Sequence, residues 1–470
     1  MANHILSKST FIRAKQCTKS LYLNKFHKEL RDRISPEQLA IFRRGTNVGI
    51  LARDLFPGGI DMSPKSPSQY QKKVAETAAA MLDHSVTVIY EAVFQYNDVL
   101  IMLDILVRNG DGWNAYEVKS SLKISETYVT DAALQYYVLL GSGINIIDFQ
   151  LVYINSEYIF NGELDLNELF TSISVIDTVK AKISEIETEV HQFKQVLSAN
   201  KIPEIAIGTQ CENPYPCDFK GFCWKNIPTK SILKLTSFSE EQLFDFVKNG
   251  IYLPSQIPFD FIQTELQQIQ IQSINTNTSF WNKEIIKQYL SPITEQKTAF
   301  IKTVIHQPAV PAINGTKPYQ QVLLAISISS SENTTKTFFI GDEISQKGNL
   351  KNVFDFLSQF NHLVTFNAFN LLQLIYLQQD ISIRNSISER ILDLNEILEK
   401  ADFFHPSISK PQNLNDLNKI LLSSYSNLKN ESYLISDLLI TPNGSTSLKF
   451  SLEQYSLALK QLSNYFIFEK

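Results

Sequence analysis

The sequence predicts an α/β fold in two domains, and three observations support this. The chain has 470 residues, which is more than one hydrophobic core usually holds. Hydrophobic residues make up 44% of it and charged residues 19%, as in folded globular proteins rather than disordered ones. Helical patterns flank a β-rich stretch at about residues 86–119, and a similar alternation returns from about residue 297. We therefore expect two α/β domains, separated by helical connectors.

Two capping patterns predict the helices before the β-rich stretch. Ser35-Pro36-Glu37-Gln38 is a capping box with proline at the first helical position, and it predicts a helix to about Leu55. Ser66-Pro67-Ser68-Gln69 has the same composition and predicts a second helix over residues 67–83.

The segments after the β-rich stretch continue the α/β alternation. Residues 126–141 are expected to form a helix that holds Asp131 and Gln135 one turn apart on one face. Residues 147–154 have the composition of a short buried strand, and the charged, amphipathic segment 175–199 is expected to be an exposed helical insert. The order helix, strands, helix, strand is that of a compact α/β domain.

Charged residues stand at the strand ends of a predicted hairpin. Asn109-Gly110-Asp111-Gly112 is a strong turn signal between two β-rich segments. Because side chains alternate along a strand, Glu117 and Lys119 should share one face while Val118 points into the core. Asp104 lies on the neighbouring strand of this hairpin. Two carboxylates and one ammonium group can meet there, which suits binding a hard divalent metal against a phosphate. The alternative is a solvated hairpin with ordinary surface charges.

This pattern, Asp-(x12)-Glu-x-Lys, resembles the PD-(D/E)xK nuclease superfamily, and most of all its RecB-type exonucleases. The resemblance implies a restriction-endonuclease-like core and metal-dependent hydrolysis of DNA that is single-stranded or has free ends. It implies that Asp104 and Glu117 bind Mg²⁺ or Mn²⁺ with the Val118 carbonyl, and that the upstream Glu91 assists them.

The resemblance also assigns roles to two polar residues beside the acids. Lys119 would polarise the attacking water or stabilise the charge that develops on the phosphate. Gln135, on the following helix, would orient the substrate or Lys119.

Four cysteines form a second constellation. Cys211, Cys217 and Cys223 are evenly spaced in a segment whose prolines and glycine exclude a long helix, and Cys17 is the fourth. Four thiolates suit a tetrahedral metal or an iron–sulfur cluster, and buried thiols without a metal are the alternative.

The cysteine order is similar to that of RecB-type nucleases of the AddB and CRISPR-adaptation kinds, with one cysteine before the nuclease motifs and three after them. The resemblance implies a [4Fe-4S] cluster on Cys17, Cys211, Cys217 and Cys223, with zinc as the less favoured metal. Such a cluster would join distant parts of the chain and stabilise the domain. The usual Gly-x-x-x-His of these families is replaced by Gly45-Thr-Asn-Val-Gly49.

The C-terminal half carries strand patterns at residues 298–305, 321–328, 337–340 and 362–366, with helices expected at 349–360 and 371–379. With Pro308-Ala-Val-Pro311, Asn314–Gln321 and Phe404-His405-Pro406, it resembles a bacterial family of uncharacterised proteins, in which a RecB-like iron–sulfur nuclease precedes an RNase H-like exonuclease domain.

This second resemblance implies a nuclease domain at 1–228, a helical connector at 229–294 and an RNase H-like domain at 295–470. Lys302 and Val304 stand where that family has Asp-x-Glu, so the second domain is expected to be degenerate and to serve binding or scaffolding. A non-catalytic nucleic-acid-binding or scaffold protein, with a structural iron–sulfur or zinc site, is the alternative for the whole chain.

Charge and hydropathy predict which partners and which cellular compartment to expect. The net charge of −5 does not indicate a nucleic-acid-binding protein, but residues 1–44 hold ten Lys and Arg against three acids, which favours local phosphate binding. No apolar run approaches the roughly 18–20 residues of a membrane helix, and the N-terminus lacks a signal-peptide pattern. We expect a cytoplasmic protein without membrane contact, whose cysteines are metal ligands rather than disulfides.

Overall fold

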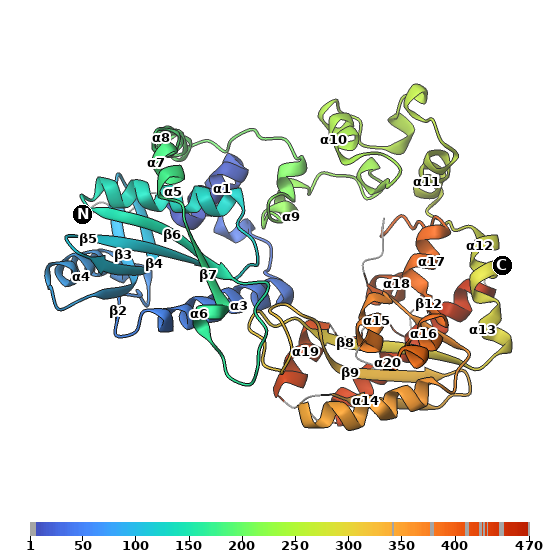
Figure 1. The fold of residues 1–470 in the computed structure, drawn as a ribbon. Coiled ribbons are helices and arrows are strands. Elements are labelled where there is room, and N and C mark those ends of the chain that lie inside the picture. Colours follow the sequence, from blue (N-terminus) through green and yellow to red (C-terminus); the bar gives the residue numbers. More distant parts are fainter. Residues whose placement is uncertain are drawn as a thin grey trace. The chain divides into compact units, whose positions relative to one another are not determined.

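The computed structural model describes residues 6–340, 343–376, 380–408, 413–422, 425, 428–429, 431–440 and 446–468. The chain divides into two compact units (Figure 1). Unit 1 comprises Met1–Asn226 and Ala309–Tyr319, and unit 2 comprises Ile227–Pro308 and Gln320–Lys470. Both are α/β units, and each contains a mixed sheet. This division differs from the expected segments, because the connector 229–294 groups with unit 2 and the short segment 309–319 groups with unit 1.

Unit 1 is built on a seven-stranded sheet of order β2-β3-β4-β5-β6-β7, with β1 paired to β4. The strands are β1 (Leu6–Ser7), β2 (Ile60–Asp61), β3 (Val88–Tyr96), β4 (Val99–Asn109), β5 (Gly112–Lys119), β6 (Ile146–Ile154) and β7 (Phe170–Ser174). The antiparallel strands β3, β4 and β5 are followed by β6, which runs parallel to β5. The predicted hairpin between β4 and β5 is confirmed, and Gly110 has a φ of 56°, which glycine adopts without strain.

Helices cover both faces of this sheet (Figure 1). They are α1 (Lys8–Gln16), α2 (Thr18–Phe26), α3 (Pro36–Ala52), α4 (Tyr70–Leu82), α5 (Glu126–Gly141), α6 (Leu166–Leu169), α7 (Ile176–Ala181), α8 (Ile183–Ser198) and α9 (Lys220–Cys223). One core joins the sheet to α1, α5, α7 and α8, and a second core joins the opposite face to α3 and segment 309–319. Alternation along β5 explains this, because Ala115 enters the first core while Tyr116 and Val118 enter the second.

Most helix predictions in unit 1 are confirmed, with two corrections. Ser35 and Gln38 form the predicted capping box of α3, and α5 covers the predicted residues 126–141. The second capping box is wrong, since a short 3₁₀ turn at Pro67–Gln69 precedes α4 and Ser66 Oγ hydrogen-bonds Ser68 Oγ at 2.7 Å. Segment 175–199 is not an exposed insert, because α8 buries a stripe at helical spacing that consists of Ile186, Val190, Phe193 and Leu197.

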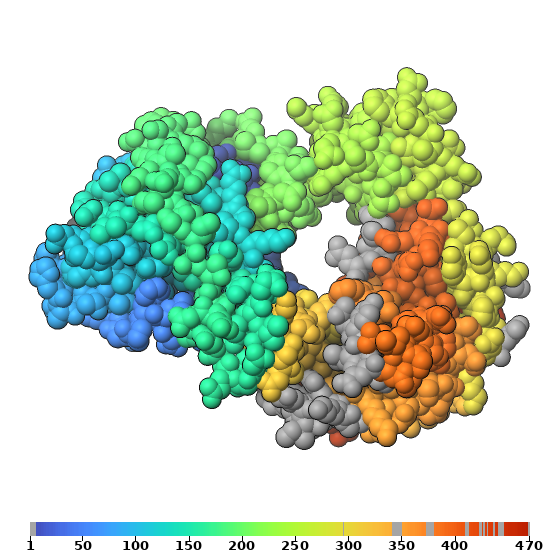
Figure 2. Space-filling model, in the orientation of Figure 1, coloured from blue at the N-terminus to red at the C-terminus, as the bar shows by residue number. Residues whose placement is uncertain are grey.

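Segment 309–319 belongs to unit 1 by its contacts. The N–H of Phe160 donates to the carbonyl of Thr316 at 3.0 Å, and the N–H of Gly315 donates to the carbonyl of Phe160 at 2.8 Å. The Tyr319 hydroxyl donates to the carbonyl of Ser120, directly after the end of β5. In Figure 2 the yellow-orange atoms of segment 309–319 lie against green atoms of unit 1.

Unit 2 contains a five-stranded sheet of order β10-β9-β8-β11-β12. Its strands are β8 (Thr298–His306), β9 (Val322–Ser330), β10 (Thr335–Phe339), β11 (His362–Thr365) and β12 (Ile391–Asp393). The first three are antiparallel neighbours, and β11 runs parallel to β8 and β12. The four predicted strands are therefore confirmed, and β12 was not predicted.

The helices of unit 2 from α12 onward pack around this sheet in two cores, and α10 (Glu240–Lys248) and α11 (Glu265–Thr276) contribute to neither core. The helices around the sheet are α12 (Lys283–Leu290), α13 (Pro292–Glu295), α14 (Glu343–Leu357), α15 (Phe369–Tyr376), α16 (Ile381–Ser388), α17 (Leu394–Lys400), α18 (Leu414–Leu421), α19 (Glu431–Ile440) and α20 (Thr446–Phe468). The helix expected at 371–379 corresponds to α15, and its residues 377–379 lie outside the described residues. In the part of the chain that the structure describes, no helix combines the length and apolar character that crossing a membrane requires.

Candidate active site and cysteine cluster

Asp104 lies where the pairing of β4 is interrupted on both sides. The pairing of β4 with β5 ends at Ile105, and its pairing with β3 omits Glu91, which lies opposite Asp104. The Asp104 carboxylate accepts the N–H of Val118 at 2.7 Å in place of a backbone carbonyl. The two strands therefore separate at the predicted acid, and its side chain joins them.

Glu117 lies at the centre of a buried hydrogen-bonded cluster. Its Oε1 accepts a hydrogen bond from Lys119 Nζ at 2.7 Å, and its Oε2 accepts one from Gln135 Nε2 at 2.9 Å. Lys119 Nζ also lies 2.5 Å from Asp131 Oδ2, one helical turn before Gln135 on α5. Glu117 is 1% exposed and Gln135 is fully buried. Gln135 thus contacts Glu117 rather than Lys119, and its expected role in orienting the substrate stays a prediction.

Lys8 is a member of this cluster that the sequence analysis did not identify. Its Nζ lies 2.7 Å from Glu117 Oε1 and 3.9 Å from Asp131 Oδ2. Lys8 is the first residue of α1, because Ser7 and Thr10 form a capping box there. That local pattern was readable from the sequence, and it predicts the helix start but not the contact.

Glu91 faces a different partner from the other acids. Its Oε1 accepts a hydrogen bond from Arg53 Nη2 at 3.1 Å. Its φ of 51° is unusual for a residue other than glycine, and such backbone strain often occurs at functional sites. Burial raises the pKa of Glu91.

The charges of the cluster shift the pKa values of its members in opposite directions. Burial and the adjacent Glu117 raise the pKa of Asp104 to about 7. Burial opposes the charge of Glu117, but Lys119 and Lys8 outweigh it and lower the pKa of Glu117 below its usual range. Burial likewise opposes the charge of Lys119, but Asp131 and Glu117 raise its pKa. Glu117 and both lysines are therefore charged at neutral pH, whereas Asp104 titrates near it, and burial also raises the pKa of Asp131.

The donor atoms of the cluster fit a hard divalent ion. Besides the carboxylates of Asp104 and Glu117, two buried oxygens, Asp131 Oδ1 and Gln135 Oε1, have no hydrogen-bond partner in the described part of the chain. Carboxylate and amide oxygens are the ligands that Mg²⁺ and Mn²⁺ prefer. Among the described residues, no three Asp, Glu, His or Cys side chains already surround one point, and Lys8 and Lys119 both lie against Glu117.

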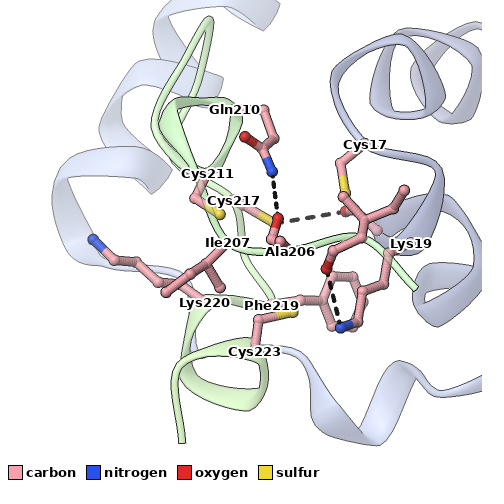
Figure 3. Close-up of a pocket in the computed structure, with 12 residues that line it drawn as sticks. Cys17, Lys19, Ala206, Ile207, Gln210, Cys211, Cys217, Phe219, Lys220 and Cys223 are labelled. Carbon is pink, nitrogen blue, oxygen red and sulfur yellow. Dashed lines mark hydrogen bonds between the residues drawn. The ribbon is translucent and has the colours of Figure 1, made fainter. Parts of the chain in front are cut away.

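All four cysteines line one cavity of unit 1 (Figure 3). Cys17 lies between α1 and α2, and Figure 3 shows it across the cavity from Cys211, Cys217 and Cys223. The structure therefore brings together the four residues that the sequence singled out.

The chemistry of this cavity fits a thiophilic metal. Its lining contains no carboxylate or imidazole, but it includes Lys19, whose positive charge suits a cluster of thiolates and lowers the pKa of Cys223 against the effect of burial. Burial raises the pKa values of the Cys17 and Cys223 thiols, so a metal would have to displace their protons.

Helix α1 connects the cysteine cluster to the candidate active site. The Arg13 guanidinium binds both oxygens of Asp218, at 2.5 and 3.0 Å. Gln16 Nε2 donates to the carbonyls of Gln210 and Tyr215, at 2.8 and 2.6 Å. The helix thus begins at the carboxylate cluster and ends directly before the first cysteine, with the cysteine loop bound to its side.

Unit 2 holds no equivalent acidic cluster on its first strand. Lys302 on β8 lies 3.0 Å from Glu431 and 5.2 Å from the ring centroid of Tyr455, and Val304 is buried. Asp393 caps α17 by accepting the N–H of Asn395. Lys302 therefore forms an ion pair within unit 2, and Asp393 serves as a helix cap.

Comparison with known proteins finds a match to a family of unknown function. No curated protein matches this chain. The matching family is a domain of unknown function, DUF2779, and its match includes segment 309–319 of unit 1 and most of the sheet of unit 2. The chain is thus similar, over residues 305–410, to DUF2779.

Proposed function

We propose that unit 1 is a metal-dependent DNA nuclease of the PD-(D/E)xK type with a restriction-endonuclease-like core. The observation that carries the proposal is the meeting of Asp104, Glu117 and Lys119 at the point where β4 and β5 separate. Strands in a mixed sheet with helices on both faces support such a core. A divalent ion held by Asp104 and Glu117 supplies Lewis-acid polarisation of the phosphate and activation of water.

The residues of the chain contribute orientation and charge. Gln135 fixes the Glu117 carboxylate through Oε2. Lys119 is held by Glu117 and Asp131, so its ammonium group is preorganised to stabilise negative charge on a phosphate. Asp104 holds the N–H of Val118, which fixes the end of β5 beside the reacting groups.

We further propose that the four cysteines bind a structural [4Fe-4S] cluster, with zinc as the alternative. A cluster would join Cys17 to Cys211 and the cysteines after it. Closing so long a loop is entropically unfavourable, so a bound cluster should stabilise unit 1. Anaerobically purified protein should absorb visible light and contain iron, and Cys17→Ala should lose both and unfold at lower temperature. A colourless, iron-free wild-type protein would contradict the cluster, and zinc in its place would support the alternative.

For unit 2 we propose a degenerate RNase H-like domain that binds or scaffolds rather than cleaves. Its first strand, β8, carries Lys302 and Val304 at the positions where two-metal chemistry needs carboxylates. The ion pair of Lys302 with Glu431 supports a structural use of that position.

The test is degradation of single- and double-stranded DNA by the full chain with Mg²⁺ or Mn²⁺. Lys119→Ala and Asp104→Ala should abolish cleavage, while Lys123→Ala, an exposed lysine just after β5, should leave it unchanged. DNA binding without cleavage by the wild type would favour a non-catalytic scaffold. Wild-type digestion by either active-site variant would remove that residue from the mechanism.

A further inference from the structure

Two ammonium groups share one carboxylate oxygen at the candidate active site. Lys8 Nζ and Lys119 Nζ each lie 2.7 Å from Glu117 Oε1. A divalent ion that used this oxygen would lie beside two ammonium groups, each 2.7 Å from the same atom. Repulsion between like charges would therefore favour the departure of one ammonium group when the ion binds.

The two lysines differ in how firmly they are held. Lys119 has a second carboxylate partner at 2.5 Å, Asp131, and its side chain is 15% exposed. Lys8 lies 3.9 Å from the same carboxylate, and its side chain is 29% exposed. Lys119 can thus keep a close partner without Glu117, whereas Lys8 cannot, and the Lys8 side chain is the more exposed of the two.

Lys8 cannot move far once it leaves Glu117, because α1 is fixed at both ends. Before the helix, Leu6 and Ser7 pair with β4 as strand β1. Near its other end, Arg13 binds Asp218 in the cysteine loop. Phe11, in the middle of the helix, is fully buried and packs against Phe193 of α8 with ring centroids 5.3 Å apart. The ammonium group would therefore remain within reach of Glu117 and Asp131, beside an ion held there.

We propose that Lys8 is a second active-site cation, which leaves Glu117 when a divalent ion binds and then contacts the phosphate of the substrate. This role rests on the proposed nuclease function. The proposed role predicts two opposite effects of the Lys8 charge. Lys8 weakens binding of the ion alone, and it strengthens binding of the ion together with DNA.

The experiment compares the full-length wild type with Lys8→Met and Lys15→Met. Methionine keeps most of the length of the unbranched side chain and removes the charge. Lys15 lies on the same helix but pairs with Glu185 and Glu189 of α8, so it is a matched control. Mn²⁺ affinity without DNA is measured by calorimetric titration, DNA cleavage by kcat/KM, and folding by thermal unfolding.

For Lys8→Met we expect Mn²⁺ to bind about tenfold more tightly, because one of the two positive charges beside Glu117 Oε1 is gone. We expect kcat/KM to fall by about 100-fold, as when one donor to a developing charge is removed. Lys15→Met should change neither value. Lys8→Arg, which keeps the charge, should restore much of the activity and weaken Mn²⁺ binding again.

The outcomes separate the two proposals. If the wild type binds Mn²⁺ and cleaves DNA while Lys8→Met behaves like Lys15→Met, the role of Lys8 is wrong and the nuclease function stands. If Lys8→Met is folded and loses Mn²⁺ affinity, Lys8 supports the site structurally and the inference is again wrong. A wild type that neither binds Mn²⁺ nor cleaves DNA overturns both.

Discussion

Replacing Asp104 by asparagine should stabilise unit 1 at alkaline pH, although it removes a proposed metal ligand. Burial and the charge of Glu117 raise the pKa of Asp104 from its usual 3.8 to about 7. The folded protein therefore holds a proton more tightly than the unfolded chain, and folding stability falls as the pH rises from 3.8 to 7. The full shift corresponds to about 4 kcal/mol. Asparagine carries no charge, and its carbonyl can still accept the N–H of Val118.

We expect Asp104→Asn to gain about 2–4 kcal/mol at pH 8 and less than half of that at pH 5, because relaxation and solvent screen part of the shift. For a unit of this size the gain at pH 8 corresponds to an increase in Tm of roughly 5–15 °C. The assay is calorimetric unfolding of the full chain in EDTA, with Asp111→Asn in the exposed turn of the same hairpin as the control.

Added Mn²⁺ should make the wild type more stable than Asp104→Asn. A Mn²⁺ concentration of 100 times Kd stabilises the wild type by about 2.7 kcal/mol and the variant by much less. A variant that unfolds below the wild type at pH 8 in EDTA would refute the reasoning, and so would a difference that does not change with pH.

Two further predictions concern the contacts that fix the site. Arg13→Met should destabilise unit 1 by about 1–2 kcal/mol in urea unfolding, because it breaks a two-point ion pair with Asp218, whose carboxylate keeps Arg31 as a partner. A loss no larger than that of Lys201→Met, which breaks a fully exposed ion pair with Glu204, would contradict it. Tyr319→Phe should lower Tm by roughly 2–4 °C, since the carbonyl of Ser120 loses a hydrogen bond worth about 1 kcal/mol, and an unchanged Tm would show that this contact contributes nothing.

The parts of the candidate site that are close in sequence could be predicted. Asp104, Glu117 and Lys119 belong to one hairpin, whose turn residues fix its register, and strand alternation decides which side chains share a face. Gln135 follows from the helical period of α5. Local rules of this kind determine both the elements and the direction of their side chains.

The contributions from distant parts of the chain could not be predicted. Lys8 precedes Glu117 by 109 positions, and it reaches the cluster only because β1 pairs in parallel with β4. The two-residue strand β1 carries no periodic signal. The stripe of α8 was visible as an amphipathic pattern, but its many charges favoured the wrong prediction of an exposed insert.

Segment 309–319 has a consequence for how this protein can be divided in the laboratory and in evolution. The chain enters unit 2 at Ile227, returns to unit 1 at Ala309 and leaves it again after Tyr319. A fragment that stops near residue 228 would expose the apolar surface that Ala309, Val310 and Tyr319 cover. Neither unit is thus one continuous stretch of chain, and after a single proteolytic cut between the units two other crossings of the chain would remain.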